Sequence, residues 1–223
     1  MNRIKDEWAD YTWNPVTGCL RNCDFCYAKE LAETRLRGRF GYPEDEPFKP
    51  TFHPNRLSEP VRIKKPAKIF VVDMGDLFGE WVDSDWIDKI IDVVRECPQH
   101  IFQFLTKNPK RYREFDFPQN CWLGASVCNS YMIENIKYMR GLKTPVKFIS
   151  FEPLLSDMPF VNLSGIDWII IGALTGRSAR QPKFGWVEHL LKTADFYGIP
   201  VFMKTNLNYT FKRREFPRNI DKW

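Results

Sequence analysis

Six short apolar runs recur along the chain, and their spacing constrains the fold more than any other feature. They cover residues 68–73, 101–106, 121–126, 146–152, 167–172 and 200–204, so that successive runs start 20 to 33 residues apart. Each run is rich in β-branched and aromatic residues and is apolar on both faces, which is typical of parallel strands buried on two sides. A seventh run, residues 10–16, precedes them. We therefore expect six or seven parallel strands.

Amphipathic segments between the runs predict helices at residues 27–36, 85–95, 130–139 and 187–197, with a short one at residues 109–115. Strands that alternate with helices at this period form βα units around a parallel sheet. We therefore expect an α/β fold, namely a partial (incomplete) parallel β/α barrel of about six to seven strands that is TIM-barrel-like in plan. An open, doubly wound sheet is the alternative.

Length and composition fit a single β/α barrel domain over residues 1–223. The 223 residues are 43% hydrophobic and 27% charged, which is a globular balance. Two segments stand apart: a Pro-rich insertion at about residues 40–66, expected to cover one end of the barrel, and a basic C-terminal tail at about residues 205–223. Because the chain shows no run as long as a membrane span and no apolar leader, we expect no membrane partner and a cytoplasmic protein.

The basic tail carries most of the net charge of +5. From residue 204 onward the chain has six cations and two acids, with Tyr209, Phe211 and Phe216 interleaved. Cations contact phosphates and aromatic rings stack on bases, so the tail is a candidate nucleic-acid contact. The alternative is an ordinary solvated C-terminal segment.

Half of the six cysteines, Cys19, Cys23 and Cys26, fall within eight residues. In a reducing compartment such clustering indicates a metal site rather than disulfides. Structural zinc takes four ligands, and the fourth would have to come from a residue such as His53 or Cys128. Three thiolates better suit an iron–sulfur cube that keeps one iron open for a small ligand.

Polar residues follow the expected strands at their carboxyl ends, where β/α folds place their chemistry. Combined with the cysteine segment, they predict one polar pocket drawn from seven places in the chain. These residues are Asp73, Gly75 and Asp76, then Thr106 and Lys107, Ser126, Ser150 and Glu152, Gly172 and Thr175, and finally Lys204, Thr205 and Asn206.

The spacing Cys-x3-Cys-x2-Cys, with Phe25 just before the last cysteine, resembles the signature of the radical SAM superfamily. Its position also fits, after the first strand and at the start of the first helix. The resemblance implies a partial β/α barrel, a [4Fe–4S] cluster held by Cys19, Cys23 and Cys26, and S-adenosylmethionine (SAM, S-adenosyl-L-methionine) at the open iron. It also implies an electron donor such as flavodoxin or ferredoxin. One electron would cleave SAM to a 5′-deoxyadenosyl radical, which abstracts hydrogen from a substrate.

The resemblance implies cofactor-binding roles as well. Phe25 and Tyr27 would lie beside the adenine. Where the superfamily has a Gly-Gly-Glu-like segment for the methionine amino group, this chain has an altered segment, Asp73-Met74-Gly75-Asp76, so Asp73 or Asp76 is the candidate. Gly75 belongs to the same segment. Ser126 is a candidate for the methionine carboxylate or the ribose, and Gly172 is a further cofactor-binding candidate.

Three charged residues are the candidates for catalytic or substrate contacts. Glu152 could contact ribose hydroxyls or substrate, and Lys107 and Lys204 could hold the methionine carboxylate or an anionic substrate. Alternatively, each lysine is an ion-pair partner of Glu152 or Asp76.

A second resemblance, to an uncharacterised family of phage and prophage proteins, spans nearly the whole chain. It rests on segments that include residues 12–19, 104–107 and 150–155. That family commonly has a longer gap between its first two cysteines, and it often has Gly-Glu where this chain has Ala173-Leu174. Any role for a glutamate at that position is therefore in doubt here.

The leading interpretation is a radical SAM enzyme of minimal size whose substrate is unknown. A nucleic acid or nucleotide is one candidate substrate, and a peptide or small metabolite is the alternative. Spore photoproduct lyase, a DNA-repair member of the superfamily, is a distant analogue by motif type. One alternative is a non-enzymatic module that binds nucleic acid through zinc or an iron–sulfur cluster. Another is a β/α barrel that has lost its cofactor chemistry and serves as a scaffold.

Overall fold

One curled sheet organises the protein, whose structure, a computed structural model, describes residues 1–4 and 7–217. The described strands lie in the order β1-β2-β5-β6-β7-β8-β9-β10, and all neighbours are parallel except the antiparallel pair β1–β2. Their bounds are β1 (Asn2–Arg3), β2 (Tyr11–Trp13), β5 (Lys68–Val71), β6 (Ile101–Thr106), β7 (Cys121–Ser126), β8 (Val146–Phe151), β9 (Trp168–Ile171) and β10 (Val201–Met203).

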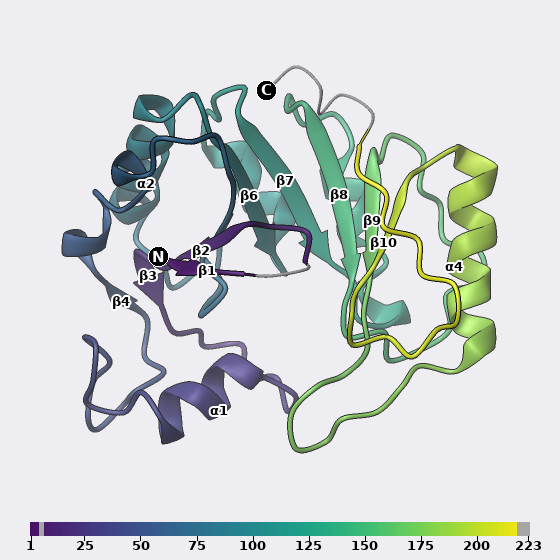
Figure 1. Cartoon of the computed structure of the whole chain (residues 1–223), viewed down its shortest axis with the longest axis horizontal. Coiled ribbons are helices and arrows are strands. Elements are labelled where there is room, and N and C mark those ends of the chain that lie inside the picture. The colour runs from purple at the N-terminus through teal and green to yellow at the C-terminus, as the bar shows by residue number, and fades with distance from the viewer. Residues whose placement is uncertain (5–6, 218–223) are drawn as a thin grey trace.

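The strand order confirms the expected half-barrel. From β2 onward the strands follow one another in chain order (Figure 1), whereas a doubly wound sheet reverses its order at a switch point. The sheet has one strand more than expected, because the N-terminal β1 adds an antiparallel edge beside β2. The predicted strand at residues 10–16 is wrong in its length: β2 ends at Trp13, and Val16 begins a separate strand.

Three helices cover the outer face of the half-barrel: α2 (Ser84–Glu96), α3 (Asn135–Met139) and α4 (Phe184–Tyr197). The helix α1 (Tyr27–Thr34) lies apart from them, below the carboxyl ends of the strands (Figure 1). The predicted helix at residues 130–139 is interrupted, because the Asn129 side chain caps a separate 3₁₀ turn, η4 (Ser130–Met132), before α3 begins. Residues 109–114 form a 3₁₀ helix, η3 (Pro109–Glu114). α4 ends at Gly198, whose φ of 65° is the left-handed conformation that glycine adopts without steric cost.

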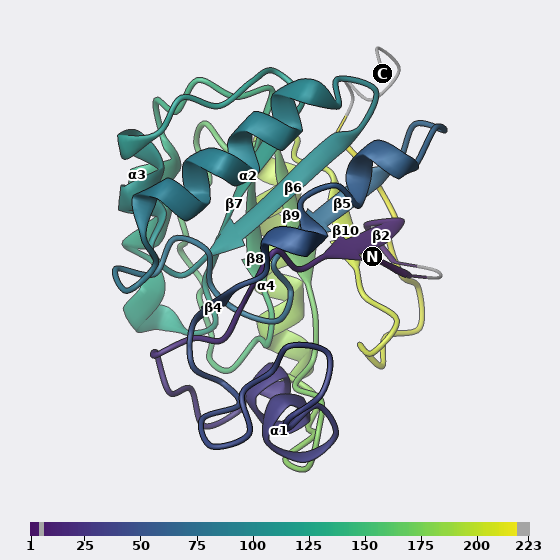
Figure 2. The ribbon, with the colours of Figure 1, turned by 90° about the vertical axis from the view of Figure 1, so that its left-hand side faces the viewer.

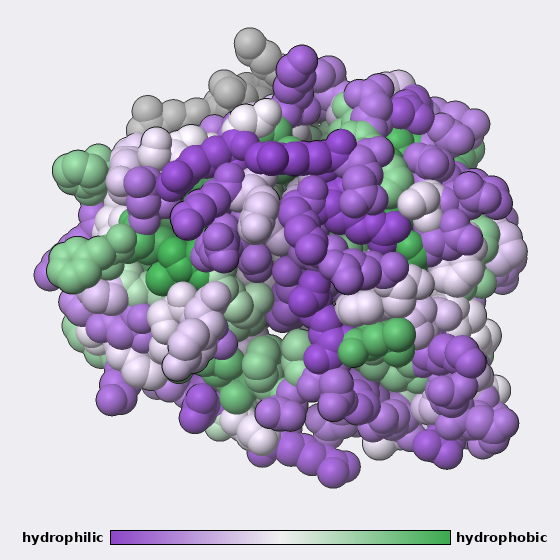
Figure 3. All heavy atoms as spheres, turned by 180° about the vertical axis from the view of Figure 1, so that it is seen from behind, coloured by the Kyte–Doolittle hydropathy of each residue, from purple (hydrophilic) through white to green (hydrophobic). Residues whose placement is uncertain are grey.

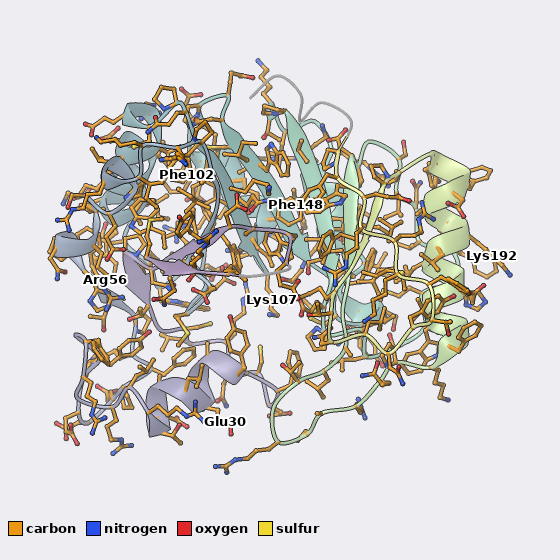
Figure 4. The ribbon with its side chains drawn as sticks, viewed as in Figure 1. Glu30, Arg56, Phe102, Lys107, Phe148 and Lys192 are labelled. Carbon is orange, nitrogen blue, oxygen red and sulfur yellow. The ribbon has the colours of Figure 1, made fainter. Side chains whose placement is uncertain are left out.

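Side chains alternate between two apolar cores across the sheet. Phe102 belongs to the outer core between the strands and the helices, and Phe148 belongs to the inner core on the concave face (Figure 4). Gly124 makes room for the inner core, because a Cβ there would lie 2.3 Å from the Phe148 ring. Both faces of each central strand are therefore buried, as the apolar runs predict.

Segments from the two ends of the chain close the concave face. Trp8 packs into the inner core beside Phe70, Phe148 and Trp168. Near the C-terminus, Phe216 stacks on Trp168 with ring centroids 5.5 Å apart, and the Trp168 indole N–H donates to the Glu215 carbonyl. Part of the predicted basic tail is therefore built into the fold.

The cations of that tail differ in their surroundings. Arg213 is engaged by acids, because its guanidinium lies 2.6 Å from Asp195 and 2.9 Å from Glu215. Two further cations that the tail prediction invoked, Arg218 and Lys222, lie outside the described residues.

The Pro-rich insertion packs beside α1 (Figure 2) and against the cysteine segment. Its strand β4 (Thr51–Phe52) pairs with β3 (Val16–Thr17), and two 3₁₀ turns follow, η1 (Pro54–Arg56) and η2 (Pro60–Arg62). The Cys19 N–H donates to the Phe48 carbonyl at 3.1 Å. The insertion therefore supports the first cysteine directly.

The rear face of the molecule is mostly hydrophilic, and its hydrophobic residues show in separate small groups (Figure 3). Within residues 1–4 and 7–217, no helix has the length and apolar character needed to cross a membrane.

Candidate functional site

A cavity of about 400 Å³ lies at the carboxyl ends of the parallel strands, between the sheet and α1. A volume of this size suits a small-molecule or cofactor site. Of the predicted pocket residues that were given no cofactor or catalytic role, Thr106, Ser150, Thr175 and Asn206 line it and Thr205 does not. Among the predicted metal-ligating, cofactor-binding and catalytic residues, all but one line it: Cys19, Cys23, Phe25, Cys26, Tyr27, Asp73, Gly75, Asp76, Lys107, Ser126, Glu152 and Lys204.

Gly172 is the exception. It is not part of the cavity lining but lies behind Glu152, and a Cβ at this position would approach the Glu152 carboxyl carbon to 2.9 Å. The missing side chain of Gly172 therefore leaves space for the Glu152 side chain. The sequence pattern does not reveal this role.

The cysteine loop has little freedom at its start. Gly18 has a φ of 88°, and a Cβ on it would lie 2.3 Å from the Lys49 carbonyl oxygen. The three thiols that follow are half-buried. The Arg21 N–H donates to the Cys19 sulfur, and the Lys29 N–H donates to the Cys26 sulfur, each at 3.4 Å.

Burial raises the pKa of the Cys19 thiol to about 11, although the Arg21 N–H opposes this shift and Asp76 adds to it. Backbone N–H groups directed at thiolate sulfurs stabilise the ionised ligand and tune cluster potentials. The loop thus offers a set of sulfur donors that a bound cationic centre would ionise.

The described residues offer no site for a single metal ion. Among them, no group of three or more His, Cys, Asp or Glu side chains converges on one point. Zinc needs four ligands about 2.0–2.3 Å from one ion. His53, the proposed fourth ligand, has its Nε2 2.8 Å from the Thr17 hydroxyl and does not line the cavity. Cys128 donates its thiol hydrogen to the Glu152 carbonyl at 3.3 Å. The three thiols lie beside an open cavity, the kind of place that a multinuclear cluster with one exchangeable position would occupy.

Asp76 is a buried carboxylate whose oxygens accept hydrogen bonds from several segments. It accepts hydrogen bonds from the Thr106 hydroxyl (2.6 Å), the Lys107 N–H (3.1 Å) and the Arg21 guanidinium (3.2 Å). The Phe78 N–H donates to it as well. With both oxygens engaged, Asp76 joins the cysteine loop to the ends of β5 and β6.

Asp73 differs from Asp76 because its side chain has fewer partners. The Asn14 amide donates to Asp73 Oδ1 at 2.6 Å, and burial raises the pKa of the Asp73 carboxyl despite that bond. The Tyr27 hydroxyl donates to the Asp73 carbonyl at 2.8 Å and links α1 to the end of β5. Of the two aspartates, Asp73 is the one with capacity for a cationic ligand group.

Two lysines face the cavity in different states. The Lys204 ammonium pairs with Glu152 Oε1 at 2.8 Å, so the alternative interpretation of this residue, an ion-pair partner, describes its geometry. Lys107 lies in the space between the sheet and α1 (Figure 4), 5.9 Å from the Phe25 ring centroid. Its ammonium forms no ion pair with any residue of the described chain.

Several lining residues escape sequence analysis. The N-terminal segment contributes Glu7, Trp8 and Thr12, of which the first two precede every predicted strand. Glu7 accepts a hydrogen bond from the Thr205 hydroxyl through Oε1, while its buried Oε2 has no partner in the part of the chain that the structure describes. Hydrophobic periodicity does not predict that these residues line the cavity, because they reach it only through the antiparallel pairing of β1 with β2.

The fold is similar to solved structures of an enzyme. One is spore photoproduct lyase complexed with dinucleoside spore photoproduct (13% identity, TM-score 0.52), and another is a mutant of spore photoproduct lyase (12% identity, TM-score 0.50). Each similarity covers 84% of this chain but 61% of the other, so the chain spans less than two thirds of that protein. At these identities the likeness shows a shared half-barrel fold.

The chain belongs to DUF5131, a family of proteins of unknown function, which it matches over residues 3–218. No curated protein matches it in sequence. Its resemblance to phage and prophage proteins stays a prediction.

Proposed function

We propose that the protein is a radical SAM enzyme. The observation that carries the proposal is the position of the Cys19, Cys23 and Cys26 thiols, which line one cavity at the carboxyl ends of a parallel half-barrel. The fold likeness to spore photoproduct lyase, a radical SAM enzyme, supports the same class. The three thiolates would hold a [4Fe–4S] cluster, and SAM would occupy the cavity beside it.

The bound cluster and SAM would supply a 5′-deoxyadenosyl radical for hydrogen abstraction. The protein's residues bind, orient and exclude water. Phe25 and Tyr27, which line the cavity, would lie beside the adenine, and Asp73 would accept a hydrogen bond from the methionine amino group. Lys107, which has no ion pair among the described residues, is suited to an anionic group such as a carboxylate.

Four further predicted residues would have separate roles. Asp76 has both oxygens engaged, so it would hold the cysteine loop rather than touch SAM. Ser126, the last residue of β7, lines the cavity and would bind the methionine carboxylate or the ribose. Glu152 and Lys204 would present an ion pair to the substrate side of the cavity.

Electron paramagnetic resonance tests this function. The protein is reconstituted anaerobically with iron and sulfide, reduced with dithionite, and measured with and without SAM. We expect a [4Fe–4S]⁺ signal whose shape changes when SAM is added. The Cys23→Ala variant should lose the signal, whereas Cys97→Ala, which removes a buried thiol far from the loop in sequence, should keep it. A signal that is indifferent to SAM would contradict the proposal.

The zinc-binding module is the second candidate. It would require the cysteine loop to close around one ion with a fourth ligand, because the described thiols do not converge on one point. Stoichiometric zinc in place of iron, retained by Cys23 and independent of SAM, would favour it. If neither the wild type nor the Cys23→Ala variant binds iron or zinc, the protein would be a β/α barrel without cofactor chemistry that serves as a scaffold.

A further inference from the structure

Two loops that border the cavity carry cations and no acids. Residues 174–183, between β9 and α4, contain three cations, and residues 204–214, after β10, contain four; neither segment contains Asp or Glu. In Figure 1 residues 174–183 run along the bottom of the molecule to α4, and residues 204–214 loop beside α4. Because net charge sets which ligands a surface attracts, this local excess of cations points to an anionic partner.

Hydrogen bonds join the two loops into one surface, which we call the rim. The Gln181 side-chain amide donates to the Asn206 carbonyl at 2.9 Å, and the Asn208 N–H donates to Gln181 Oε1 at 2.7 Å. Thr175 and Asn206, one from each loop, also line the cavity. The rim is therefore continuous with the cavity mouth.

Three cations of the rim are available to a partner. Among the described residues, Arg180, Lys183 and Lys212 form no ion pair. Lys212 donates to the Thr205 carbonyl at 2.9 Å, and the Lys183 ammonium lies over the Trp186 ring. A fourth cation, Arg177, pairs with Glu30 at an exposed position, where an ion pair contributes little to stability and can be exchanged.

The acids of the neighbouring helix α4 do not cancel this charge. Glu188 accepts a hydrogen bond from the Tyr209 hydroxyl, and Asp195 pairs with Arg213 at 2.6 Å. Both carboxylates are thus occupied by rim residues other than the three available cations.

Exposed aromatic rings stand among these cations. The Phe184 ring is 67% exposed and stacks on Tyr209, with centroids 5.3 Å apart and planes 6° from parallel. Phe211 is 83% exposed. Exposed rings that alternate with cations form the surface on which single-stranded nucleic acids bind, because bases stack on the rings while phosphates meet the cations. A duplex keeps its bases stacked on one another and cannot use the rings in this way.

We infer that the rim binds a single-stranded nucleic-acid segment and leads one of its nucleotides to the cavity. The substrate would then be a nucleotide within a strand and not a free nucleotide. The reaction on that nucleotide rests on the proposed function, but binding to the rim does not require it.

Fluorescence anisotropy of a 5′-labelled twelve-residue oligothymidylate tests the inference, with the cluster-reconstituted protein at several salt concentrations. We expect binding that is weaker for the matching duplex. Phe211→Ala should weaken it about tenfold, since stacking contributes about 1–3 kcal/mol per base. Replacing Arg180, Lys183 and Lys212 together by Ala should lower the slope of log K against log salt by about 2, because each single-strand phosphate contact contributes about 0.7. The labelled RNA counterpart decides whether the strand is DNA or RNA.

The controls use the same residue types on the same protein. Phe196, 82% exposed near the end of α4, is the matched aromatic, and Lys192, which points outward from α4 (Figure 4), is the matched cation. Phe196→Ala and Lys192→Ala should leave the affinity unchanged. Absence of binding, equal affinity for the duplex, or equal effects of rim and control variants would overturn the inference. Iron content and the paramagnetic signal, read on the same samples, report separately on the proposed function.

Discussion

The Arg21 guanidinium lies 3.2 Å from Asp76 Oδ2, so an ion pair between the cysteine loop and the segment after β5 helps to fix the loop over the cavity. Asp76 also accepts hydrogen bonds from Thr106 and from the Lys107 N–H, which follow β6 at the end of that strand. One buried carboxylate thus joins three segments that are far apart in sequence. The geometry of the site depends on this carboxylate although it has no free oxygen for a ligand.

Replacement of Asp76 by Ala should destabilise the protein and loosen the loop. We expect a loss of about 3 kcal/mol in the free energy of unfolding, because several donors lose a charged acceptor in a buried place. Urea denaturation measures it. The exposed Asp88→Ala variant is the control and should change stability by less than about 0.5 kcal/mol. Equal losses of stability in the two variants would show that the hydrogen bonds of Asp76 do not stabilise the fold.

Two glycines should respond to alanine with opposite signs. Gly18→Ala places a Cβ 2.3 Å from the Lys49 carbonyl oxygen at a φ of 88°, so it should destabilise the fold and reduce iron loading. Gly185→Ala meets nothing within 4 Å in the first turn of α4 and should stabilise by about 0.4–1 kcal/mol. Thermal unfolding of both variants checks the signs. A stabilised Gly18→Ala variant would exclude the close approach.

His53 should make stability depend on pH. Burial, together with the nearby Arg56, lowers the pKa of His53 to about 4; the ring also lies 6.2 Å from that of Tyr42. The folded state therefore favours the neutral ring, so this contribution is complete above about pH 6.5 and is lost as the pH falls toward 4. Between pH 7.5 and 4.5, wild type should lose about 2 kcal/mol more unfolding free energy than His53→Asn. Parallel urea curves of the two proteins at both pH values measure the difference, and identical losses would refute it.

The Lys204–Glu152 pair should show energetic coupling. Both side chains are 22% exposed, so removing one partner leaves the other charge poorly solvated. In a double-mutant cycle with Lys204→Met and Glu152→Gln, we expect a coupling of about 1–2 kcal/mol. The exposed pair Lys110–Glu80, at 3.1 Å, is the matched control and should couple by less than about 0.5 kcal/mol. Similar coupling in both cycles would contradict the role given to burial.

The sequence predicts the half-barrel well because its strands are buried on both faces. Residues 101–106 and 146–151 alternate between two apolar cores, so their positions are hydrophobic or small apart from Gln103 and Lys147, and each run is visible without a structure. The helix at residues 130–139 is predicted less well, because the Asn129 cap that starts a separate 3₁₀ turn depends on one local hydrogen bond and not on periodicity.

The candidate site likewise has parts that local sequence patterns predict and parts that they do not. The cysteine spacing and the polar residues at strand ends are local patterns, and parallel strands bring their carboxyl ends to one edge by geometry alone. The sequence by itself therefore determined the strand order, the three thiols and most of the cavity lining.

Only the tertiary structure decided which of these residues are free to bind. Asp76 and Lys204 have their charges engaged, whereas Lys107 has no ion pair among the described residues, and Gly172 serves as space for Glu152. The tertiary structure also places Glu7 and Trp8 in the cavity lining and joins the two loops of the rim through Gln181. The physical reason is that hydrogen bonds and ion pairs form between segments far apart in the chain, and no local pattern records which partner each polar group finds when water is excluded.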